Sequence, residues 1–394
     1  MNSLFPLERS VWSLPPDVVP FNHGSFGPTP VVVQEAREDW SRRLASQPMR
    51  FFLQEAESEL DNARKELAKL VGSSAQNLVF VDNATFAMNI VAATVRLQPG
   101  DEVLLNDHEY GAVFRIWRTV AERAGAKVIT ATLPLPLTND DEIVASLMNR
   151  VTPQTRLIVC SHVTSPTAVI LPIQKIAQAA AKLEIPLCVD GPHAIAMREL
   201  NLKTLGCDFY CASLHKWLAA PLGSGFLWAH PRWHAKLQSP LISWGRSLGG
   251  VAPNWRDDFQ WWGTRDPAPC LAVPAAIQFL KTAGWTEFRE WTHQQVRQAA
   301  DVLKAEFGAT PLVPDSPDWY GSMITLALPS QNAGQKPFLS DPLQKALADE
   351  FQIELPIVWW RETRHLRLSW YLYNTSNDLD KLVEALKSLL KRFP

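Results

Sequence analysis

The chain has 394 residues, of which 46% are hydrophobic and 20% are charged, and its formal net charge is -2. This is ordinary globular composition, and at roughly 150 residues per domain the length leaves room for two domains with sizeable cores. The near-zero net charge, with both signs interspersed along the chain, argues against nucleic-acid and membrane partners, so we expect a small-molecule substrate.

The sequence carries no targeting, membrane or metal-binding signal. The first 20 residues hold acidic residues and prolines where a signal peptide needs a basic start, and no apolar stretch approaches about 18 residues. The five cysteines are odd in number and most lie in apolar stretches, which favours a reducing compartment. Cys207 and Cys211 lack a second close pair or a downstream histidine pair, so no metal site is expected. These features predict a cytoplasmic protein.

An N-terminal arm, residues 1–30, leads into two predicted helices. Val31–Gln47 and Gln54–Val71 both place apolar residues at helical spacing. Pro30 precedes the first helix and Gly72 follows the second, which are typical start and stop residues.

Between residues 78 and 228, short apolar runs alternate with helical segments such as Phe86–Arg96 and Ile173–Leu183. The predicted strands are Leu78–Val81, Glu102–Leu105, Lys127–Ala131, Leu157–Cys160, Leu187–Val189, Phe209–Ala212 and Gly225–Trp228. Strands separated by helices form βαβ units, so we expect an α/β fold with a mainly parallel central sheet. The segment Pro231–Pro269 has little periodicity and is predicted to be an ordered loop before a helix at Val273–Thr282.

A smaller α+β domain, residues 285–394, is predicted after a large domain of residues 31–284. Its predicted elements are a helix at Thr286–Phe307, a strand at Met323–Leu328, a helix at Leu343–Phe351, short strands around Pro356 and Leu368, and a last helix at Asp378–Phe393. Gln331–Pro337 is the candidate flexible loop. We expect the N-terminal segment to pack on this smaller domain.

The strongest indication of chemistry in the sequence is the combination of Asp190 and Lys216. Asp190 ends the apolar strand pattern Leu187–Val189, and Lys216 lies in the run Ser213-Leu214-His215-Lys216-Trp217. A strand-end carboxylate can pair with a protonated pyridine nitrogen, and a lysine amine can condense with an aldehyde. These are the two protein groups that pyridoxal 5'-phosphate (PLP) most needs. Each residue alone is more typical of a solvated surface, but together they predict a PLP site.

A phosphate site is predicted where Asn83-Ala84-Thr85 follows a strand and opens a helix. The free amides and the positive end of a helix dipole suit an anion there, and Ser213 and His215 supply further donors. The alternative is a plain helix cap made by Asn83 or Thr85, which is a common arrangement.

Aromatic and hydroxyl side chains follow two other predicted strands. His108 and Tyr110 offer flat rings at a strand's carboxyl end, where open α/β sheets bind ligands, and we rank His108 slightly ahead for stacking on the pyridine. An ordinary loop histidine is the alternative. Ser165 presents a hydroxyl toward a substrate carboxylate or the ring oxygen, or else it caps a turn. His193 is close enough in sequence to Asp190 to reach the same ring.

Eight stretches, in order along nearly the whole chain, resemble the class V aminotransferase-like enzymes of fold-type I, and in particular the isopenicillin N epimerase group. They are Phe21–Gly27, Asn83–Thr85, Asp107–Ala112, His162–Ser165, Asp190–His193, His215–Leu218 with Pro221–Phe226, Trp262–Pro267, and Leu366–Ser369 with Tyr373–Asn374. Two departures are Pro192, where the family usually has a small residue, and Ser165, where the cysteine-desulfurase branch usually has an asparagine.

The resemblance implies three catalytic residues and a set of binding residues. Lys216 would hold PLP as an internal aldimine, Asp190 would pair with the pyridine nitrogen, and His193 would approach the ring hydroxyl. Other cofactor contacts would come from Asn83, Ala84, Thr85, His108, Tyr110, Ser165, Ser213 and His215. Arg367 would bind the substrate α-carboxylate, a bidentate task that suits a guanidinium.

The resemblance also implies a homodimer with shared active sites, because Gly263 and Thr264 would reach the phosphate bound to the neighbouring subunit. Asn22 and His23, in the first of the eight stretches, would lie on the substrate side.

Epimerisation at Cα is the favoured reaction, with cysteine or cystine C-S lysis second and transamination third. Persulfide-forming desulfuration is disfavoured, because Asp349–Arg367 contains no cysteine. Epimerisation needs a second acid on the far face of the substrate, for which His23, Tyr110 or a partner-chain residue are the candidates. A non-enzymatic scaffold is disfavoured, since Lys216 and Asp190 are both present.

Overall fold

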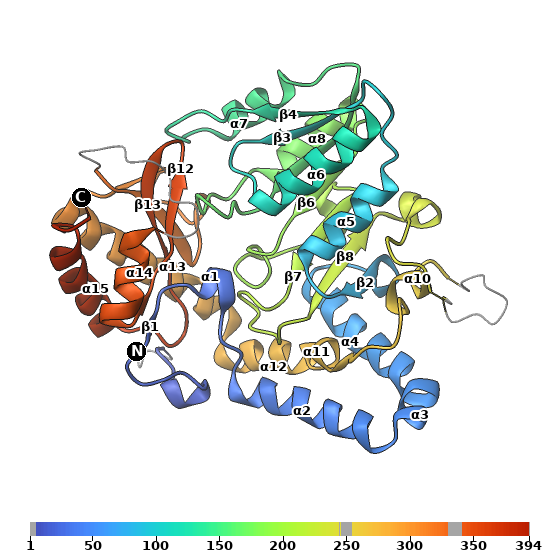
Figure 1. Ribbon diagram of the computed structural model, residues 1–394, viewed down its shortest axis with the longest axis horizontal. Helices are drawn as coiled ribbons and strands as arrows, with labels where there is room; N and C mark the ends of the chain where they lie inside the picture. The colour runs from blue at the N-terminus through green and yellow to red at the C-terminus, as the bar shows by residue number, and fades with distance from the viewer. Residues whose placement is uncertain (1–4, 244, 246–253, 330–340, 394) are drawn as a thin grey trace.

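The computed structural model describes residues 5–243, 245, 254–329 and 341–393 (Figure 1). The strands at the centre of the larger domain are β2 (Leu78–Val81), β3 (Glu102–Asn106), β4 (Lys127–Ala131), β5 (Thr155–Ser161), β6 (Leu187–Asp190), β7 (Phe209–Ser213) and β8 (Gly225–Ala229). They form one seven-stranded sheet in the order β2-β8-β7-β6-β5-β3-β4. β8 is antiparallel to both of its neighbours, and the other adjacent pairs are parallel. The predicted α/β fold with a mainly parallel sheet is confirmed.

Helices cover both faces of this sheet, so its central strands are mainly apolar. On β2, Val79 faces the cluster that includes α5 (Ala84–Thr94) and α6 (Gly111–Ala124), whereas Phe80 faces the core that includes α8 (Ile173–Lys182). Successive strand residues point to opposite faces, and a sheet buried on both sides therefore needs continuous apolar runs. This is why the strands were recognisable in the sequence.

The remaining helices of the larger domain frame the sheet. They are α2 (Val31–Ser46), α3 (Pro48–Arg50), α4 (Ala56–Leu70), α7 (Asp140–Met148), α9 (Leu202–Leu205), α10 (Asp257–Gln260), α11 (Ala268–Leu271) and α12 (Val273–Ala283), with the short helices η2 (Phe51–Glu55), η3 (Ala75–Asn77) and η4 (Pro231–Lys236). The predicted helix from Gln54 thus begins as a π-helical segment. η4, α10 and α11 lie where a loop was predicted, because helices of four to six residues are too short to show a period. Residues 244 and 246–253 of that loop lie outside the described residues.

The smaller domain consists of a four-stranded antiparallel sheet and three helices among the described residues. Its helices are α13 (Trp285–Phe307), α14 (Pro342–Phe351) and α15 (Ser376–Leu389), and its sheet strands are β9 (Thr310–Pro311), β10 (Met323–Ala327), β12 (Ile357–Trp360) and β13 (Thr363–Ser369). The strand order is β12-β13-β10-β9. The predicted flexible loop, Gln331–Pro337, lies outside the described residues.

The N-terminal segment packs on the smaller domain. It contains η1 (Arg9–Val11), β1 (Val19–Pro20) and α1 (His23–Phe26). β1 pairs in parallel with β11 (Ile353–Glu354), and the Ser369 amide donates to the Phe21 carbonyl at 3.0 Å. This pairing brings α1 to the junction of the two domains.

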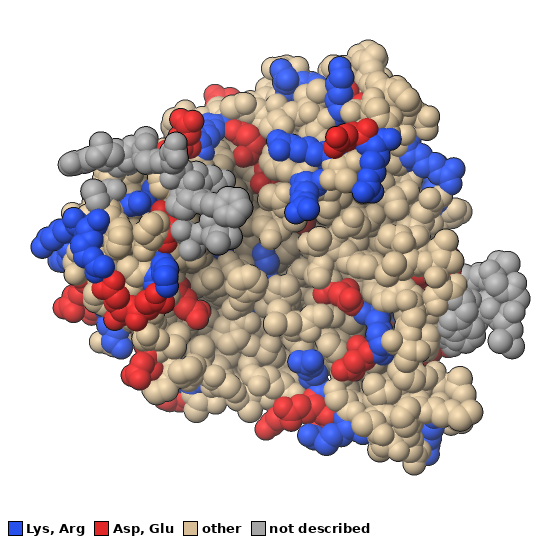
Figure 2. Space-filling view, viewed as in Figure 1, with Lys and Arg blue, Asp and Glu red and all other residues tan. Residues whose placement is uncertain are grey.

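The carboxyl ends of the parallel strands meet at this junction. β3, β5, β6 and β7 run in the same direction, so the segments that follow them emerge at one edge of the sheet. Figure 2 shows that the surface is hollowed between the domains. In the described ranges, no helix is both long and apolar enough to cross a lipid bilayer.

Candidate active site

A cavity of about 390 Å³ opens at the carboxyl edge of the sheet and is closed on its other side by α1 and β13. Most of the predicted site residues line it: Asn83, Ala84, Thr85, Tyr110, Ser165, Asp190, His193, Ser213, His215, Lys216 and Arg367. These residues come from six separate parts of the chain, so the fold assembles the pocket that the motifs predict.

Lys216 lies in the turn after β7, and its Nζ is 2.8 Å from Nε2 of His193. Burial lowers the pKa of Lys216 to about 7, with a further lowering from Arg367 that Asp190 partly opposes. An amine with such a pKa has a substantial unprotonated fraction near neutral pH, and the unprotonated form attacks an aldehyde. Lys216 is therefore prepared as a nucleophile.

Asp190 ends β6 and is 7% exposed. Burial raises its pKa to about 6, although the nearby Lys216 lowers it. None of the described side chains donates a hydrogen bond to its carboxylate. A buried carboxylate of this kind is stabilised by a cationic partner, and a pyridinium nitrogen is such a partner.

His193 is 2% exposed and its Nδ1 is buried without a hydrogen-bond partner among the described residues. Burial, followed by the charge of Lys216, holds the pKa of His193 well below its usual value, so the ring is neutral. A neutral imidazole next to an amine can accept or donate one hydrogen bond, which suits the hydroxyl of a bound ring.

The start of α5 supplies an anion site. Asn83 caps the helix, with its Oδ1 accepting from the Phe86 amide at 2.9 Å, so the alternative cap assignment is also correct. Ser213 Oγ accepts from the Ala84 amide at 2.9 Å, which leaves the hydroxyl proton available to a ligand. Nδ1 of His215 is buried and has no partner in the described part of the chain. Donors therefore converge on a site next to a helix N-terminus, as a phosphate requires.

A glycine on β8 allows this close approach. A Cβ at Gly225 would lie 2.8 Å from Cα of Asn83 and 2.7 Å from the carbonyl oxygen of Ala212. Contacts this short are not tolerated, so the turn that bears Asn83 can sit against β8 only because position 225 has no side chain.

Arg367 projects from β13 into the opposite wall. Its NH1 donates to the Ser165 carbonyl at 2.6 Å, and its NH2 donates to Ser25 Oγ. Its Nε is buried without a partner among the described residues, and burial lowers its pKa to about 10. No carboxylate of the described chain pairs with this guanidinium, so a substrate carboxylate would supply the missing charge.

His108 does not reach the cavity, contrary to the sequence-based ranking. Its ring is fully buried, its Nδ1 bonds Thr167 Oγ1 at 2.7 Å, and it packs against Trp360 with ring centroids 4.3 Å apart. Tyr110 lines the cavity instead and is 48% exposed. The turn after β3 directs these two side chains to opposite sides, which residue type alone did not show.

His23 and Asn22 also lie outside the cavity lining. The His23 ring is fully buried, with Nδ1 2.9 Å from the Tyr373 hydroxyl and Nε2 3.1 Å from the Lys216 carbonyl oxygen. It stacks on Tyr371 at 3.5 Å, so it supports the turn of Lys216 from behind. The structure therefore gives His23 no place in the lining of this cavity, and its role in substrate binding stays a prediction.

Gly263 and Thr264 are exposed and do not line the cavity of their own chain. Sequence reasoning did not single out two residues that do, Ser25 and Phe26, although both lie within the first of the eight stretches. It also passed over Glu109, a buried carboxyl whose oxygens accept from the amide and hydroxyl of Ser161 at 2.7 and 2.6 Å. Its position after a strand was the available signal.

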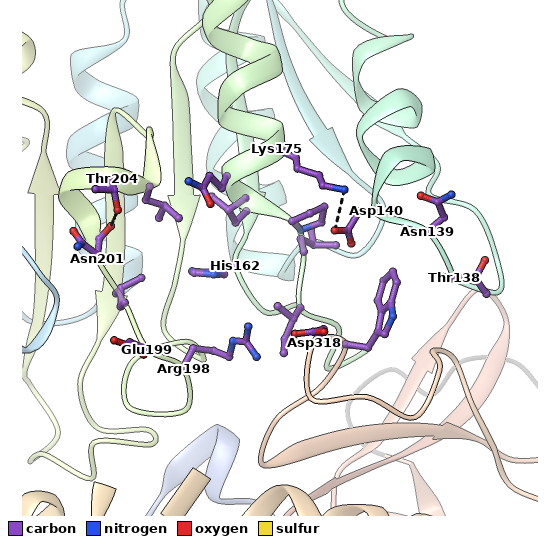
Figure 3. Close-up of a pocket in the computed structure, with 18 residues that line it drawn as sticks. Thr138, Asn139, Asp140, His162, Lys175, Arg198, Glu199, Asn201, Thr204 and Asp318 are labelled. Atoms are coloured by element: carbon purple, nitrogen blue, oxygen red, sulfur yellow. Dashed lines mark hydrogen bonds and ion pairs between the residues drawn. The ribbon is translucent and has the colours of Figure 1, made fainter. Parts of the chain in front are cut away.

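Figure 3 shows a second cavity, of about 680 Å³, between α7, α8 and the smaller domain. Its charged side chains have both signs, and Lys175 pairs with Asp140 at 3.3 Å. None of the predicted cofactor residues lines it. In the described ranges there is also no group of three or more histidine, cysteine, aspartate or glutamate residues placed to hold a metal ion. The smaller cavity, with Lys216, is the candidate active site.

A mainly parallel sheet, a lysine and an aspartate at its carboxyl edge, and a phosphate cradle at a helix start define a fold-type I enzyme whose pocket fits PLP. The chain belongs to the class V aminotransferase family, because the family profile "Aminotransferase class-V" matches residues 25–382.

Individual relatives agree with this assignment. The chain is 35% identical to isopenicillin N epimerase of Streptomyces clavuligerus, over 95% of this chain and 96% of the relative. It is 28% identical to a probable chloroplastic L-cysteine desulfhydrase of Arabidopsis thaliana, over 95% and 84% of the two chains. A solved structure of C-DES, with glycine covalently linked to its PLP cofactor, superimposes with a TM-score of 0.83 at 20% identity and covers 96% of this chain and 99% of its own. The last comparison supports the fold.

Proposed function

We propose that this PLP-dependent enzyme removes the Cα proton of an α-amino acid and returns a proton to the opposite face. The observation that carries the proposal is the pocket itself, where Lys216 with its lowered pKa, a buried Asp190 and an uncompensated Arg367 face one cavity. The 35% identity to isopenicillin N epimerase over nearly the full chain favours epimerisation.

Each residue has a distinct task in this proposal. Bound PLP supplies an electron sink that acidifies the Cα–H bond. Lys216 would hold the cofactor through Nζ; once the substrate amine displaces Nζ from the cofactor carbon, the freed neutral amine would take the Cα proton, while Asp190 would pair with the protonated pyridine nitrogen. Arg367 binds the α-carboxylate with its paired N–H groups and thereby fixes which substrate bond faces Lys216.

Tyr110 is proposed to cover one face of the cofactor ring and to serve as the acid on the far side of the substrate. Of the two candidates within this chain, Tyr110 lines the cavity and His23 does not. A phenol can both stack on a pyridine and exchange a proton, so one residue serves both tasks.

β-Elimination from cysteine or cystine is the second candidate, favoured by the similarity to the Arabidopsis desulfhydrase. Persulfide chemistry of the desulfurase type requires a thiol near the substrate. The five cysteines, at 160, 188, 207, 211 and 270, are all buried and none lines the cavity.

The deciding experiment follows the purified holoenzyme in deuterated water with L-cysteine, L-cystine, isopenicillin N and a panel of other L-amino acids. Deuterium at Cα together with the D-epimer, and no keto acid, supports epimerisation. Pyruvate with released sulfide moves the assignment to C-S lysis, and a keto acid with an aminated cofactor moves it to transamination. An Arg367→Ala variant should show a strongly raised KM with unchanged cofactor absorbance, and Lys216→Ala should be inert.

We further propose a cytoplasmic homodimer in which exposed Gly263 and Thr264 contact the cofactor phosphate of the neighbouring subunit. The buried free thiols suit a reducing compartment. Sedimentation gives the oligomeric state. Mixing an inactive Lys216→Ala chain with a Thr264→Val chain tests the shared site, because a mixed dimer would regain one complete pocket.

A further inference from the structure

We propose that Arg361 is a positioning residue that sets the distance between Arg367 and Tyr110. The inference rests on the proposed tasks of these two residues, namely binding of the substrate carboxylate by Arg367 and contact with the cofactor by Tyr110. It concerns a contact between the two domains that lies outside the cavity lining.

Arg361 lies at the tip of the β12–β13 hairpin. β12 and β13 pair from Ile357↔Leu366 to Trp360↔Thr363, so Arg361 and Glu362 form the connecting turn. Both have positive φ, 46° and 60°. Positive φ at both positions is characteristic of a type I′ hairpin turn, which usually contains asparagine or glycine. Arginine and glutamate have side chains that disfavour positive φ, so the backbone of this turn is strained. Such strain is often found at functional positions.

The arginine side chain crosses to the larger domain. Its Nε donates to Oδ2 of Asp107 at 2.9 Å, and its NH2 donates to the same oxygen and to the Leu133 carbonyl at 2.8 Å. The other oxygen of Asp107 accepts from the Leu133 amide at 3.0 Å. The guanidinium is thus held by two segments, the turn after β3 and the turn after β4.

Trp360 adds two contacts to the same place. Its Nε1 donates to the Asp107 carbonyl at 2.8 Å, and its ring packs on His108. The guanidinium of Arg361 lies over the Trp360 ring, 4.5 Å from the centroid. Arg361 and Asp107 are 31% and 20% exposed at the side chain, so this ion pair belongs to a network that is partly shielded from water.

The two ends of this network lead directly to the active site. Asp107 comes three residues before Tyr110, and Arg361 comes six residues before Arg367, in the turn that leads into β13. Tyr110 and Arg367 both line the cavity. The Arg361–Asp107 ion pair, together with the Trp360–Asp107 hydrogen bond, therefore ties the segment that carries the cofactor-facing ring to the strand that carries the carboxylate-binding group. Arg361 touches neither substrate nor cofactor, and it acts through the placement of these two residues.

The loss of this contact has a specific consequence. Other contacts between the domains remain, such as the Ile170 amide to the Trp319 carbonyl at 2.9 Å, so the protein stays folded. The Trp360 hydrogen bond still holds the hairpin to the turn after β3, but the guanidinium no longer fixes the position of β13. A small displacement of Arg367 then weakens the contact with a carboxylate. Ligands that lack a carboxylate do not depend on this distance.

The test compares glycine with methylamine as probes of the holoenzyme. Both are amines, and binding of each at the cofactor is followed by the change in visible absorbance. We expect Arg361→Ala to lower the affinity for glycine about tenfold and to keep the affinity for methylamine within about twofold of the wild type, since methylamine has no group for Arg367 to bind. Arg361→Lys should recover part of the glycine affinity, because an ammonium keeps the charge but not the paired donors.

Arg392→Ala is the matched control. Arg392 donates twice to Glu350, at 3.0 and 2.7 Å, within the smaller domain, and this pair is exposed. Loss of this ion pair should change the affinity for neither probe. A double variant, Arg361→Asp with Asp107→Arg, should bind glycine more tightly than Arg361→Asp alone, because it rebuilds an ion pair at the same place.

Failure of this inference is distinct from failure of the proposed function. If Arg367→Ala binds glycine and methylamine as the wild type does, the carboxylate assignment is wrong and the proposed function fails. If Arg367→Ala selectively loses affinity for glycine but Arg361→Ala binds both probes as the wild type does, only the positioning role is overturned. An equal loss of both probes in Arg361→Ala also overturns it, since that pattern reports general disruption.

Discussion

Nζ of Lys216 lies 2.8 Å from Nε2 of His193, and both side chains are buried. Two cations cannot share such a site, because burial penalises each charge and proximity adds repulsion. The pair therefore carries at most one positive charge near neutral pH. This arrangement gives the active-site lysine an available lone pair without a dedicated base next to it.

The first prediction concerns the pH dependence of cofactor attachment. The neutral amine of Lys216 is the reactive form, and its pKa is lowered to about 7 by burial. In the apoprotein, the rate at which the cofactor absorbance develops after PLP is added should therefore rise with pH, with a midpoint near 7. An apparent midpoint close to that of an exposed lysine, about 10.4, would contradict the assigned environment.

The second prediction separates Tyr110 from His108. Tyr110→Ala should weaken PLP binding by about twofold to tenfold, because an aromatic contact contributes about 0.5–1.5 kcal/mol. His108→Ala should leave PLP affinity unchanged and lower the free energy of unfolding by about 1–3 kcal/mol, because it removes one of the two partners of the buried Thr167 hydroxyl and the ring that packs on Trp360. Cofactor titration and denaturant unfolding measure the two effects. Weak PLP binding in the His108 variant would restore the original ranking.

The third prediction concerns Glu109. Burial raises its pKa to about 8, so the folded protein binds a proton there that the unfolded chain has released above about pH 4.5. Stability linked to this group is therefore present at low pH and falls as pH rises from about 4.5 to about 8. Glu109→Gln should flatten that part of the profile, measured by thermal unfolding across pH.

The glutamine fits the existing contacts. Its oxygen can accept from the Ser161 amide and from Asn106, as Oε1 of Glu109 does, and its amide group can donate to the Ser161 hydroxyl. Glu109→Ala is the control, since it leaves these donors unsatisfied and should be destabilising at every pH. An unchanged slope in Glu109→Gln would show that Glu109 is ionised throughout.

The fourth prediction tests the phosphate cradle at the start of α5. Thr85→Val keeps the shape of the side chain but removes its hydroxyl, so affinity for PLP should fall by about tenfold, the value of one charge-assisted hydrogen bond. Affinity for pyridoxal, which has no phosphate, should stay within about twofold. Equal losses for the two ligands would mean that Thr85 supports the ring and not the phosphate.

Several features of the fold were predictable because they depend on local sequence. β2 was placed to the residue, since a strand buried on both faces of a sheet contains a continuous apolar run. The short helices within Pro231–Pro269 were not, because four to six residues give no measurable period. Asp190 and Lys216 were found because each stands at the end of a recognisable strand, where parallel sheets bind ligands.

The sequence by itself determined the α/β class, the family and the chemistry of the pocket, since residue types and their order carry these. The tertiary structure decided which side chains enter the pocket. It directs Tyr110 into the cavity and His108 away from it, and it buries His23 behind Lys216. It also pairs Arg361 with Asp107, which lies 254 positions earlier in the chain. Side-chain direction in a turn and contacts between distant segments arise from packing in three dimensions, and residue spacing along the chain does not encode them.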